Sequence, residues 1–590
     1  MNMIDKSKAT LFLLITILIL TGYCQGSSLH HDGQISTETP AGSLHDMNPP
    51  VGRNSTFPSQ LSLQVLPQTA KERIIVRYKT DVIKPGPVLT EVMNSMNQKV
   101  GSSVITDFSP MGIPGMQIIR PDNRTIEDTI RQYTNNSLVL YAEPDHVIAL
   151  SPSEQPESVN NYSISSKNTQ STNPNDPDYS LLWGLYNTGQ APFYGTAGSD
   201  ISAADAWSTT TGSSSVIVAV VDTGVDYTHE DLSSNIWTNS GEIAGNNKDD
   251  DGNGYVDDIR GWNFVDDSND PMDDNGHGTH CAGTIAAVGN NNIGVTGVCW
   301  HAQIMPLKFL DSSGSGYTSD AISAILYADQ KGAHIFSNSW GGTEYSRALK
   351  EAIDASSAVV VCAAGNEEEN SDISPVYPAA YTSSNIISVA ATGYTDNLAS
   401  FSNYGATSVD IAAPGVKILS TYPENTYAYL SGTSMATPHV AGVAGLILAK
   451  NSELASSQVK SQILESADVL TGLSGKMVSG GRLNAAGAVR SSSNTNVTSP
   501  NSTEAGGSSG LQASFTAAPR QGKAPLIVQF LESSSGGKNS WRWKFGDGEV
   551  SFVRNPRHIY QNSGTYQVTL TVSDGNNSST GIKTGFITVR

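Results

Sequence analysis

Cysteine is scarce in this chain, with four among 590 residues, and one of these, Cys24, lies in an apolar N-terminal stretch. The other three, Cys281, Cys299 and Cys362, can form at most one disulfide bond, which excludes a disulfide-based scaffold. Basic residues are also few, 34 against 55 acidic ones, and the net charge is −21. This balance argues against nucleic acid or an anionic membrane surface as the partner. It suits a secreted protein that needs solubility or binds cations.

Long apolar runs are absent after the N-terminus. Residues 5–26 begin with Lys6 and Lys8 and continue with about a dozen apolar residues, the layout of a secretory signal. A transmembrane helix would need ~20 apolar residues. We therefore predict a signal peptide over residues 1–26, cleaved near Gly26, and no transmembrane segment. A secreted, extracellular protein is expected, and attachment to a cell surface is left open.

The composition then changes several times along the chain. Residues 27–70 are rich in Ser, Thr, Pro and Gly and predict a linker. Residues 71–150 alternate strand-like and helix-like patterns and predict a small α+β unit whose last strand covers 139–150. A polar linker over 151–172 and a flexible one over 491–510 bound the longest region.

Residues 173–490 predict an α/β domain with a largely parallel sheet and helices on both faces. Its apolar runs are short and continuous, as in strands buried on both sides, and active sites of such folds lie at the carboxyl ends of strands. The expected strands cover residues 216–222, 302–310, 333–339, 358–365, 386–392 and 409–415, and the expected helices 280–288, 318–331, 347–356 and 437–450. Residues 511–590 alternate apolar and polar positions and predict an all-β sandwich.

Four polar residues lie at the ends of these elements. Asp222 ends a strand, His277 opens a helix, Asn366 follows a strand and a glycine turn, and Ser434 heads the helical stretch 430–450. A serine that attacks, a histidine that takes and returns its proton, and an acid that orients the imidazole form a serine hydrolase site. Asn366 and the Ser434 N–H would stabilise the oxyanion. Each residue also has an ordinary structural interpretation as a turn or helix-capping residue.

The motifs VVDTGVD, HGTHCAG, AAGN and SGTSMATPHVAG, in this order, resemble those of the subtilisin-like serine proteases (subtilases, peptidase family S8) over residues 173–490. The segments NPNDPDY and GWNFVDD are most similar to the thermitase branch of that family. The resemblance implies a monomeric endopeptidase that hydrolyses peptide bonds of proteins. It also implies that the unit at 71–150 is an I9-like propeptide, an intramolecular inhibitor that self-cleavage within 151–172 releases.

The resemblance further implies that substrate peptides bind by strand addition. The matching positions are Gly314, Ser315, Gly316, Ser339, Trp340 and Gly341, with Ala363, Ala364 and Gly365 on the wall of the primary pocket. An apolar or aromatic preference is implied, although Glu367 to Glu369 near this pocket could favour basic residues.

Structural Ca²⁺ is the expected cofactor. The acidic loop NNKDDDGNGYVDD (246–258) offers oxygen ligands around a glycine turn, although a solvated loop is the alternative. Its expected ligands are Asp249, Asp251, Asn253, the carbonyl of Tyr255 and Asp258. The resemblance implies a second site formed by Asp176, Asp231, Asn291 and the carbonyls of Val288, Ile293 and Val295. Zinc on His277 and His280 is disfavoured because the HExxH motif is absent.

The segments WRWKFGDG (541–548), NPRHIY and GTYQVTLTV resemble a PKD domain, an immunoglobulin-like sandwich that implies a spacer or binding to a matrix protein or glycan. Two other functions are open. A surface adhesion protein with an inactive protease scaffold would have no need of the complete set of four site residues. An esterase is supported only by GGSSG in the linker at 491–510, where no strand precedes and no helix follows.

Overall fold

The computed structural model describes residues 73–151, 156–158, 173–490, 511–535, 540–547, 549–551, 554, 556–573 and 578–590. The expected signal peptide and the linkers at 27–70 and 491–510 lie outside these residues, as does most of the linker at 151–172. None of the described helices is long and apolar enough to cross a membrane.

A nine-stranded sheet forms the centre of the α/β domain, in the order β17-β18-β14-β13-β12-β11-β7-β9-β8. All neighbours are parallel except β17 and β18. The strands are β7 (Ile217–Asp222), β8 (Trp262–Asn263), β9 (Gln303–Lys308), β11 (Ile335–Asn338), β12 (Val359–Ala363), β13 (Ile386–Thr392), β14 (Ile411–Pro414), β17 (Asp468–Val469) and β18 (Gly481–Arg482). The six strands expected from apolar runs are all in this sheet, so the predicted α/β architecture is confirmed.

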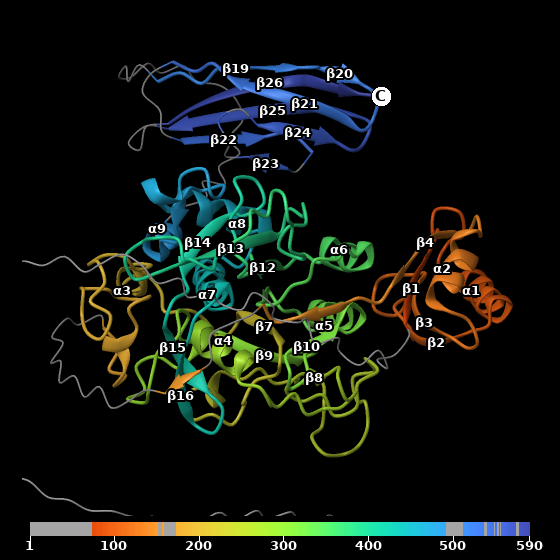
Figure 1. Cartoon of the computed structure of the whole chain (residues 1–590), viewed down its shortest axis with the longest axis horizontal. Helices are drawn as coiled ribbons and strands as arrows, with labels where there is room; N and C mark the ends of the chain where they lie inside the picture. The colour runs from red at the N-terminus through yellow and green to blue at the C-terminus, as the bar shows by residue number, and fades with distance from the viewer. Residues whose placement is uncertain are drawn as a thin grey trace, which may run out of the picture. The chain divides into compact units, whose positions relative to one another are not determined.

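Helices cover both faces of this sheet (Figure 1). Alternate residues of β7 point into different cores, Val218 and Val220 into one and Ala219 and Val221 into the other. The first core also contains residues of α3 (Ala203–Trp207), α4 (His277–Ala286), α7 (Thr433–Lys450), α8 (Ser456–Glu465) and α9 (Ala485–Arg490), and the second contains residues of α5 (Thr318–Gln330) and α6 (Arg347–Ala355). Short 3₁₀ turns are η1 (Tyr179–Leu181), η2 (Ser233–Asn235) and η3 (Thr471–Leu473).

The N-terminal α+β unit is a four-stranded antiparallel sheet in the order β2-β3-β1-β4 with two helices. Its elements are β1 (Ile74–Tyr78), α1 (Pro87–Val100), β2 (Ser102–Asp107), β3 (Met116–Pro121), α2 (Ile126–Thr134) and β4 (Val139–Pro144). The sequence did not predict β2. The single last strand expected over 139–150 was wrong, because the chain leaves the sheet at Asp145, whose carboxylate accepts hydrogen bonds from the N–H (2.8 Å) and hydroxyl (2.6 Å) of Ser319.

Beyond Asp145 the chain pairs with the α/β domain. Strand β5 (Val147–Ala149) runs antiparallel to β10 (Ser315–Tyr317), and β6 (Glu157–Ser158) adds to the hairpin of β15 (Ile418–Tyr422) and β16 (Thr426–Leu430). The left-handed backbone just before β10 requires glycine. Gly314 has φ +76°, and a methyl group there would lie 2.7 Å from Leu150 Cδ1.

The C-terminal domain is a sandwich of two sheets, ordered β19-β21-β24 and β20-β26-β25-β22-β23. Its strands are β19 (Phe515–Ala518), β20 (Gln521–Gly522), β21 (Leu526–Glu532), β22 (Ser540–Lys544), β23 (Val550–Ser551), β24 (Arg557–Tyr560), β25 (Gly564–Ser573) and β26 (Ser578–Val589). Trp543 and Tyr560 are fully buried, and the Tyr560 hydroxyl donates to the Phe545 carbonyl at 3.0 Å. Both residues therefore belong to the core of the sandwich.

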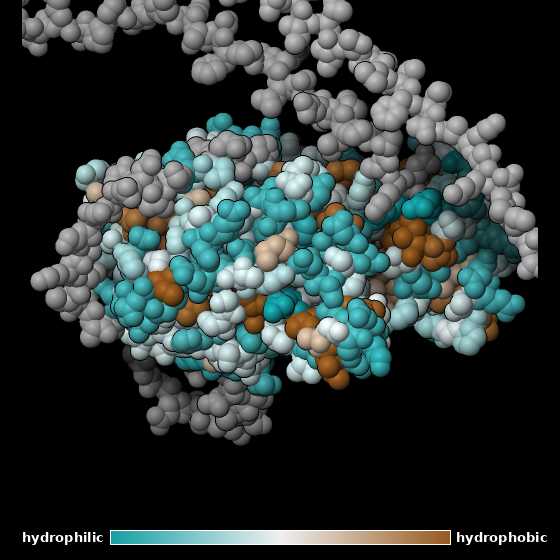
Figure 2. Space-filling view, turned by 90° about the horizontal axis from the view of Figure 1, so that it is seen from below, coloured by the Kyte–Doolittle hydropathy of each residue, from teal (hydrophilic) through white to brown (hydrophobic). Residues whose placement is uncertain are grey.

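Hydrophilic residues predominate on the face of the molecule that Figure 2 shows, and hydrophobic residues form small separate patches there. This surface agrees with the net charge of −21, which favours solubility.

Candidate active site

Asp222 and His277 form a buried polar contact of the site. Asp222 is the last residue of β7 and His277 the first of α4, and both are buried. The His277 Nδ1–H donates to Asp222 Oδ1 at 2.8 Å. Burial alone would lower the pKa of His277, but the charge and hydrogen bond of Asp222 raise it above 6.5. Among the described residues His277 Nε2 has no hydrogen-bond partner, so this nitrogen is available to accept a proton.

Asp273 ties the end of β7 to the start of α4. Its carboxylate accepts hydrogen bonds from the Thr223 hydroxyl (2.8 Å), the Gly276 N–H (2.9 Å) and the Thr279 hydroxyl (2.6 Å). The Thr223 hydroxyl in turn accepts from the Gly278 N–H at 3.0 Å. Burial raises the pKa of Asp273, and these hydrogen bonds oppose the rise. Because Thr223 follows Asp222 directly, this clamp fixes the distance between the acid and the imidazole.

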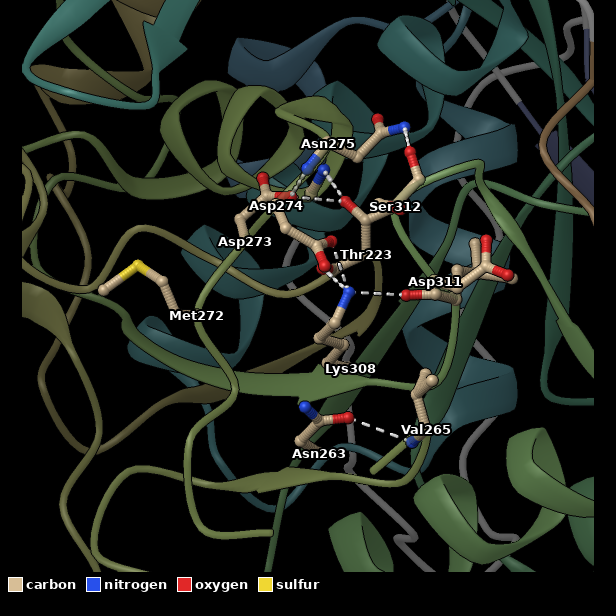
Figure 3. Close-up of polar contacts among 12 residues, drawn as sticks. Thr223, Asn263, Val265, Met272, Asp273, Asp274, Asn275, Lys308, Asp311 and Ser312 are labelled. Carbon is tan, nitrogen blue, oxygen red and sulfur yellow. Dashed lines mark hydrogen bonds and ion pairs between the residues drawn. The ribbon is translucent and has the colours of Figure 1, made fainter. Parts of the chain in front are cut away.

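Lys308 lies beside the loop that contains Asp273 and Asp274 (Figure 3). Its ammonium group, on a side chain that is 3% exposed, donates to the carbonyls of Thr223 (2.9 Å) and Leu310 (2.8 Å) and to the Asp274 carboxylate (2.6 Å). Burying a charge is costly unless its hydrogen bonds are satisfied, and all three protons of this group have acceptors. A buried cation thus holds the strand end that carries Asp222 against the loop that leads to His277.

Ser434 is the second residue of α7, after the N-cap Gly432. Its hydroxyl donates to the Ser339 carbonyl at 3.1 Å, and the Ser339 hydroxyl donates to the Ser434 carbonyl at 3.0 Å. In this rotamer the Ser434 hydroxyl points to Ser339. The position at a helix start leaves backbone N–H groups free of intrahelical partners, which favours negative charge beside it.

Asn366 lies beside the nucleophile with its amide in a defined orientation. Its Oδ1 accepts hydrogen bonds from the N–H (2.8 Å) and hydroxyl (2.9 Å) of Thr433. A methyl group on Gly432 would lie 3.3 Å from Asn366 Nδ2 and 3.6 Å from the Ser434 backbone nitrogen. Both nitrogens therefore lie within 3.6 Å of this one point.

The expected substrate-binding segments hold the chain that follows the N-terminal unit. Ala149 and Gly341 exchange N–H···O hydrogen bonds of 3.2 and 3.1 Å, and the Leu150 N–H donates to the Gly314 carbonyl at 2.9 Å. A pocket of about 410 Å³ lies next to this pairing. It is lined by Ala149, Leu150, Ser151, Gly341, Gly342, Thr343, Glu367, Glu369, Ser374, Pro375, Val376 and Asn403.

Of the nine expected substrate residues, only Gly341 lines this pocket. Trp340 is 1% exposed, its indole N–H donates to the Val221 carbonyl at 2.7 Å, and its ring packs on Phe309, so the side chain belongs to the core. Ala363 and Ala364 are also buried. Val376 and Asn403 were missed, because they come from segments that carry no motif and reach the pocket only through the fold.

Asp176, Asp231 and Asn291 come together as the resemblance implied. Asp176 accepts hydrogen bonds from the Asn290 (2.8 Å) and Asn291 (3.0 Å) N–H groups, and the Asn291 side chain donates to Asp231 at 2.8 Å. Asp231 also accepts from the Val295 N–H (2.9 Å), and its carbonyl accepts from the Val288 N–H (2.9 Å). Burial raises the pKa of Asp231 to about 6. Two buried carboxylates with neutral donors around them fit a divalent cation.

The acidic loop differs from the ligand set expected for it. Carboxylate oxygens of Asp249, Asp251 and Glu242 lie within 4.8 Å of one another, and the sequence pattern had not included Glu242. Asp258 instead accepts hydrogen bonds from Asn239 (2.9 Å), Asn253 (2.8 Å) and Tyr327 (2.5 Å). The Lys331 ammonium contacts Asp251 and lies 3.6 Å from Asp258. The Lys331 ammonium group therefore already neutralises part of the negative charge of this acidic loop.

The three described cysteines, Cys281, Cys299 and Cys362, are buried free thiols, and burial raises the pKa of each. The His280 ring donates from Nε2 to the carbonyls of Ile418 (3.0 Å) and Ala428 (3.1 Å), which directs it to the core rather than to a metal shared with His277.

Comparison with known proteins agrees with this geometry. The sequence profile of the Subtilase family matches residues 213–508, and that of the PKD domain matches residues 512–589. Thermitase of Thermoactinomyces vulgaris is 44% identical over 293 residues, which are 49% of this chain and 94% of the relative. The thermophilic serine proteinase of Bacillus sp. (strain AK1) is 33% identical over 433 residues, 72% of this chain and 92% of the relative. Subtilisin DY of Bacillus licheniformis is 42% identical over 256 residues, 43% and 83% respectively.

The fold and these matches define a serine endopeptidase. The chain belongs to the subtilase family and carries a C-terminal PKD domain.

Proposed function

We propose that Ser434, His277, Asp222 and Asn366 perform peptide-bond hydrolysis in this protein. The observation that carries the proposal is the buried hydrogen bond of 2.8 Å between Asp222 and His277 at the start of α4, a helix whose Cys281 thiol contacts the Ser434 carbonyl at 3.5 Å. We infer that the Ser434 hydroxyl turns from the Ser339 carbonyl to His277 Nε2, which accepts the proton as the oxygen attacks the carbonyl carbon. Asn366 Nδ2 and the Ser434 N–H donate to the oxyanion, and the imidazolium then protonates the leaving amine. Water, deprotonated by the same imidazole, next attacks the acyl-Ser434 ester and releases the acid product and the free serine.

Covalent labelling tests this assignment. Diisopropyl fluorophosphate should modify the self-processed protein once, on the peptide that contains Ser434, and abolish casein hydrolysis. The Asp222→Asn variant should label at least about 10³-fold more slowly, because the wrong imidazole tautomer removes the base. Labelling of another serine, or hydrolysis that survives labelling of Ser434, would exclude the proposed role.

We also propose that the protein is a zymogen and that the unit at 71–150 is its inhibitor. In support, Arg73 pairs with Asp320 (2.7 Å) and Arg77 with Glu351 (2.8 Å). Glu143 accepts hydrogen bonds from the hydroxyl of Ser346 (2.7 Å), which caps α6. A carboxylate at a helix N-terminus is stabilised by the dipole. With β5 in the substrate groove, these contacts hold the unit where it blocks other peptides.

Calcium is proposed to stabilise the fold at Asp176, Asp231 and Asn291, with the carbonyls of Val288, Ile293 and Val295. Ca²⁺ would supply only charge compensation there, away from the chemistry. The inactive Ser434→Ala protein should lose thermal stability on chelation by up to about 2.7 kcal/mol if the free Ca²⁺ had been 100 times its Kd. Asp231→Asn should abolish most of this shift, whereas Asp205→Asn, at an exposed position of α3, should leave it intact. An unchanged melting temperature on chelation would refute the site.

Secretion follows from the predicted signal peptide and is part of this proposal. The PKD domain is proposed to bind a matrix protein or a glycan.

A further inference from the structure

Two short strand pairings hold the segment that joins the N-terminal unit to the protease domain. Strand β5 pairs with β10, and Ala149 also bridges Gly341. Strand β6 pairs antiparallel with β16, with Glu157 opposite Tyr429 and Ser158 opposite Ala428. In the described residues β16 has β15 on its other side, so β6 occupies the remaining edge of this hairpin.

Both pairings are anchored next to the nucleophile. Gly341 lies two positions after Ser339, whose carbonyl accepts the Ser434 hydroxyl. Strand β16 ends at Leu430, and the segment that follows it leads directly to Ser434. Residues 149 and 157 are separated by eight Cα steps, which span at most ~29 Å when extended. The two pairings are therefore at most ~29 Å apart along the chain.

Lys417 adds a charge contact to the second pairing. Its ammonium group lies 2.7 Å from a carboxylate oxygen of Glu157, and its backbone N–H donates to the Ser431 hydroxyl at 3.0 Å. The Lys417 side chain is 23% exposed and that of Glu157 60%. In a chain of net charge −21, acidic peptides are repelled in general, so a fixed cation at this strand edge has a selective effect.

We propose that the edge of β16, together with Lys417, is a docking strand for the part of a substrate that lies C-terminal to the cleaved bond. It takes an extended segment with an acidic residue near Lys417, and Glu157–Ser158 occupies this place before processing, which this proposal places between residues 151 and 157. Main-chain hydrogen bonds to β16 give affinity, and the Lys417 contact gives the preference for acidic residues. This inference rests on the proposed endopeptidase function and deepens it.

Kinetics of the self-processed enzyme test the docking strand. Two fluorogenic peptides share one cleavable sequence and differ in an eight-residue C-terminal extension, which is rich in Glu in one and in Lys in the other. A third, short substrate lacks the extension and ends in a chromophore at the cleaved bond. The wild type should show a KM about two- to five-fold lower for the Glu peptide, the range of an exposed ion pair. Lys417→Glu should reverse this ratio and Lys417→Arg should keep it, with each variant normalised to its own rate on the short substrate.

Lys523→Glu, which changes the same charge at an exposed position of the PKD domain, should keep the wild-type ratio. The docking strand is overturned if the wild type has equal KM values for the two extended peptides, or if Lys417→Glu leaves their ratio unchanged. Cleavage of the short substrate would in either case still support the proposed protease function. A wild type that cleaves none of the substrates overturns both.

Self-processing of the full chain gives a second test that does not depend on peptide design. Glu157→Lys should slow the cut about two- to five-fold, and the double variant Glu157→Lys with Lys417→Glu should restore the rate. A double variant slower than either single variant would contradict the pairing.

Discussion

Lys308 lies opposite Asp222 in the parallel pairing of β9 with β7, and its ammonium group donates a hydrogen bond to the carbonyl of Thr223. The two residues end neighbouring strands, so their backbones are held by the sheet itself. The Phe309 N–H donates to the Asp222 carbonyl at 3.0 Å and reinforces this junction. Asp222 is thus held in place through Thr223, whose carbonyl accepts a hydrogen bond from Lys308 and whose hydroxyl donates one to Asp273.

Replacing Lys308 by methionine should lower both stability and activity. The methionine fills the space but leaves the carbonyls of Thr223 and Leu310 without a donor, which costs about 2–3 kcal/mol of unfolding free energy. Displacement of Asp222 should lower kcat by up to about 10²-fold with a smaller change in KM. Thermal melting and steady-state kinetics measure these effects. Lys523→Met is the matched control and should change neither, and a Lys308→Met enzyme with wild-type kcat would contradict the positioning role.

Replacing Asn366 by alanine should leave a weak but measurable enzyme. Loss of the equivalent donor in subtilisin, a relative in the same family, costs about 10²–10³ in kcat, and that magnitude is borrowed here. KM should change little, because the oxyanion forms only during the reaction. Asn370→Ala, four residues further along the same loop, is the control. A similar loss in both variants would assign the effect to the loop rather than to the amide.

The activity should rise with pH through the raised pKa of His277. Burial lowers this pKa, but the carboxylates of Asp222 and Asp273 raise it above 6.5. Only the neutral imidazole accepts the serine proton, so kcat/KM increases as pH rises past this pKa and then levels off. Asp273→Asn removes one raising charge and should move the midpoint to lower pH, whereas Asp205→Asn should not. A midpoint that stays in place in Asp273→Asn would contradict this electrostatic account.

The cleaved N-terminal unit should be held more tightly at pH 5 than at pH 8. Burial against Ser319 raises the pKa of Asp145 from 3.8 to about 7. A carboxyl group with a raised pKa takes up a proton on binding, so affinity grows as pH falls below 7, by up to about tenfold per unit until pH 4. Above pH 7 the group is charged in both states and this contribution is lost.

Dissociation of this unit can be followed by native mass spectrometry after self-cleavage and inhibition with a serine-reactive reagent. Asp145→Asn should flatten the pH dependence, and Asp81→Asn, at an exposed position of the same unit, should retain it. Equal pH dependence in the wild type and Asp145→Asn would show that another group controls release.

Much of the protease fold was predictable because buried parallel strands are continuous apolar runs. The runs at 216–222 and 386–392 match β7 and β13 within one residue, and Asp222 and His277 fall where the sequence placed them, at a strand end and a helix start. These features are local, so the order of residues along the chain encodes them.

The contacts made over long sequence separations were not predictable. In the sequence Lys308 is an ordinary strand residue, and its ion pair with Asp274 forms only in the folded chain. Glu242 likewise lies near Asp249 and Asp251 only because of the tertiary fold. Strand β2 has a single buried residue, Ser102, and three exposed ones, a weaker signal than a buried run. Trp340 occupies a motif position, yet its large apolar ring is stabilised by burial beside Phe309 rather than by lining the pocket.

Intact mass measured over time for the wild type and Ser434→Ala, in calcium and with casein added afterwards, tests the central claim most directly. We expect the wild type to lose its N-terminal region up to a bond within 151–172 and then to digest casein, while Ser434→Ala stays full length and leaves casein intact. A Ser434→Ala protein that matures and digests casein like the wild type would contradict the assignment of Ser434 as the nucleophile.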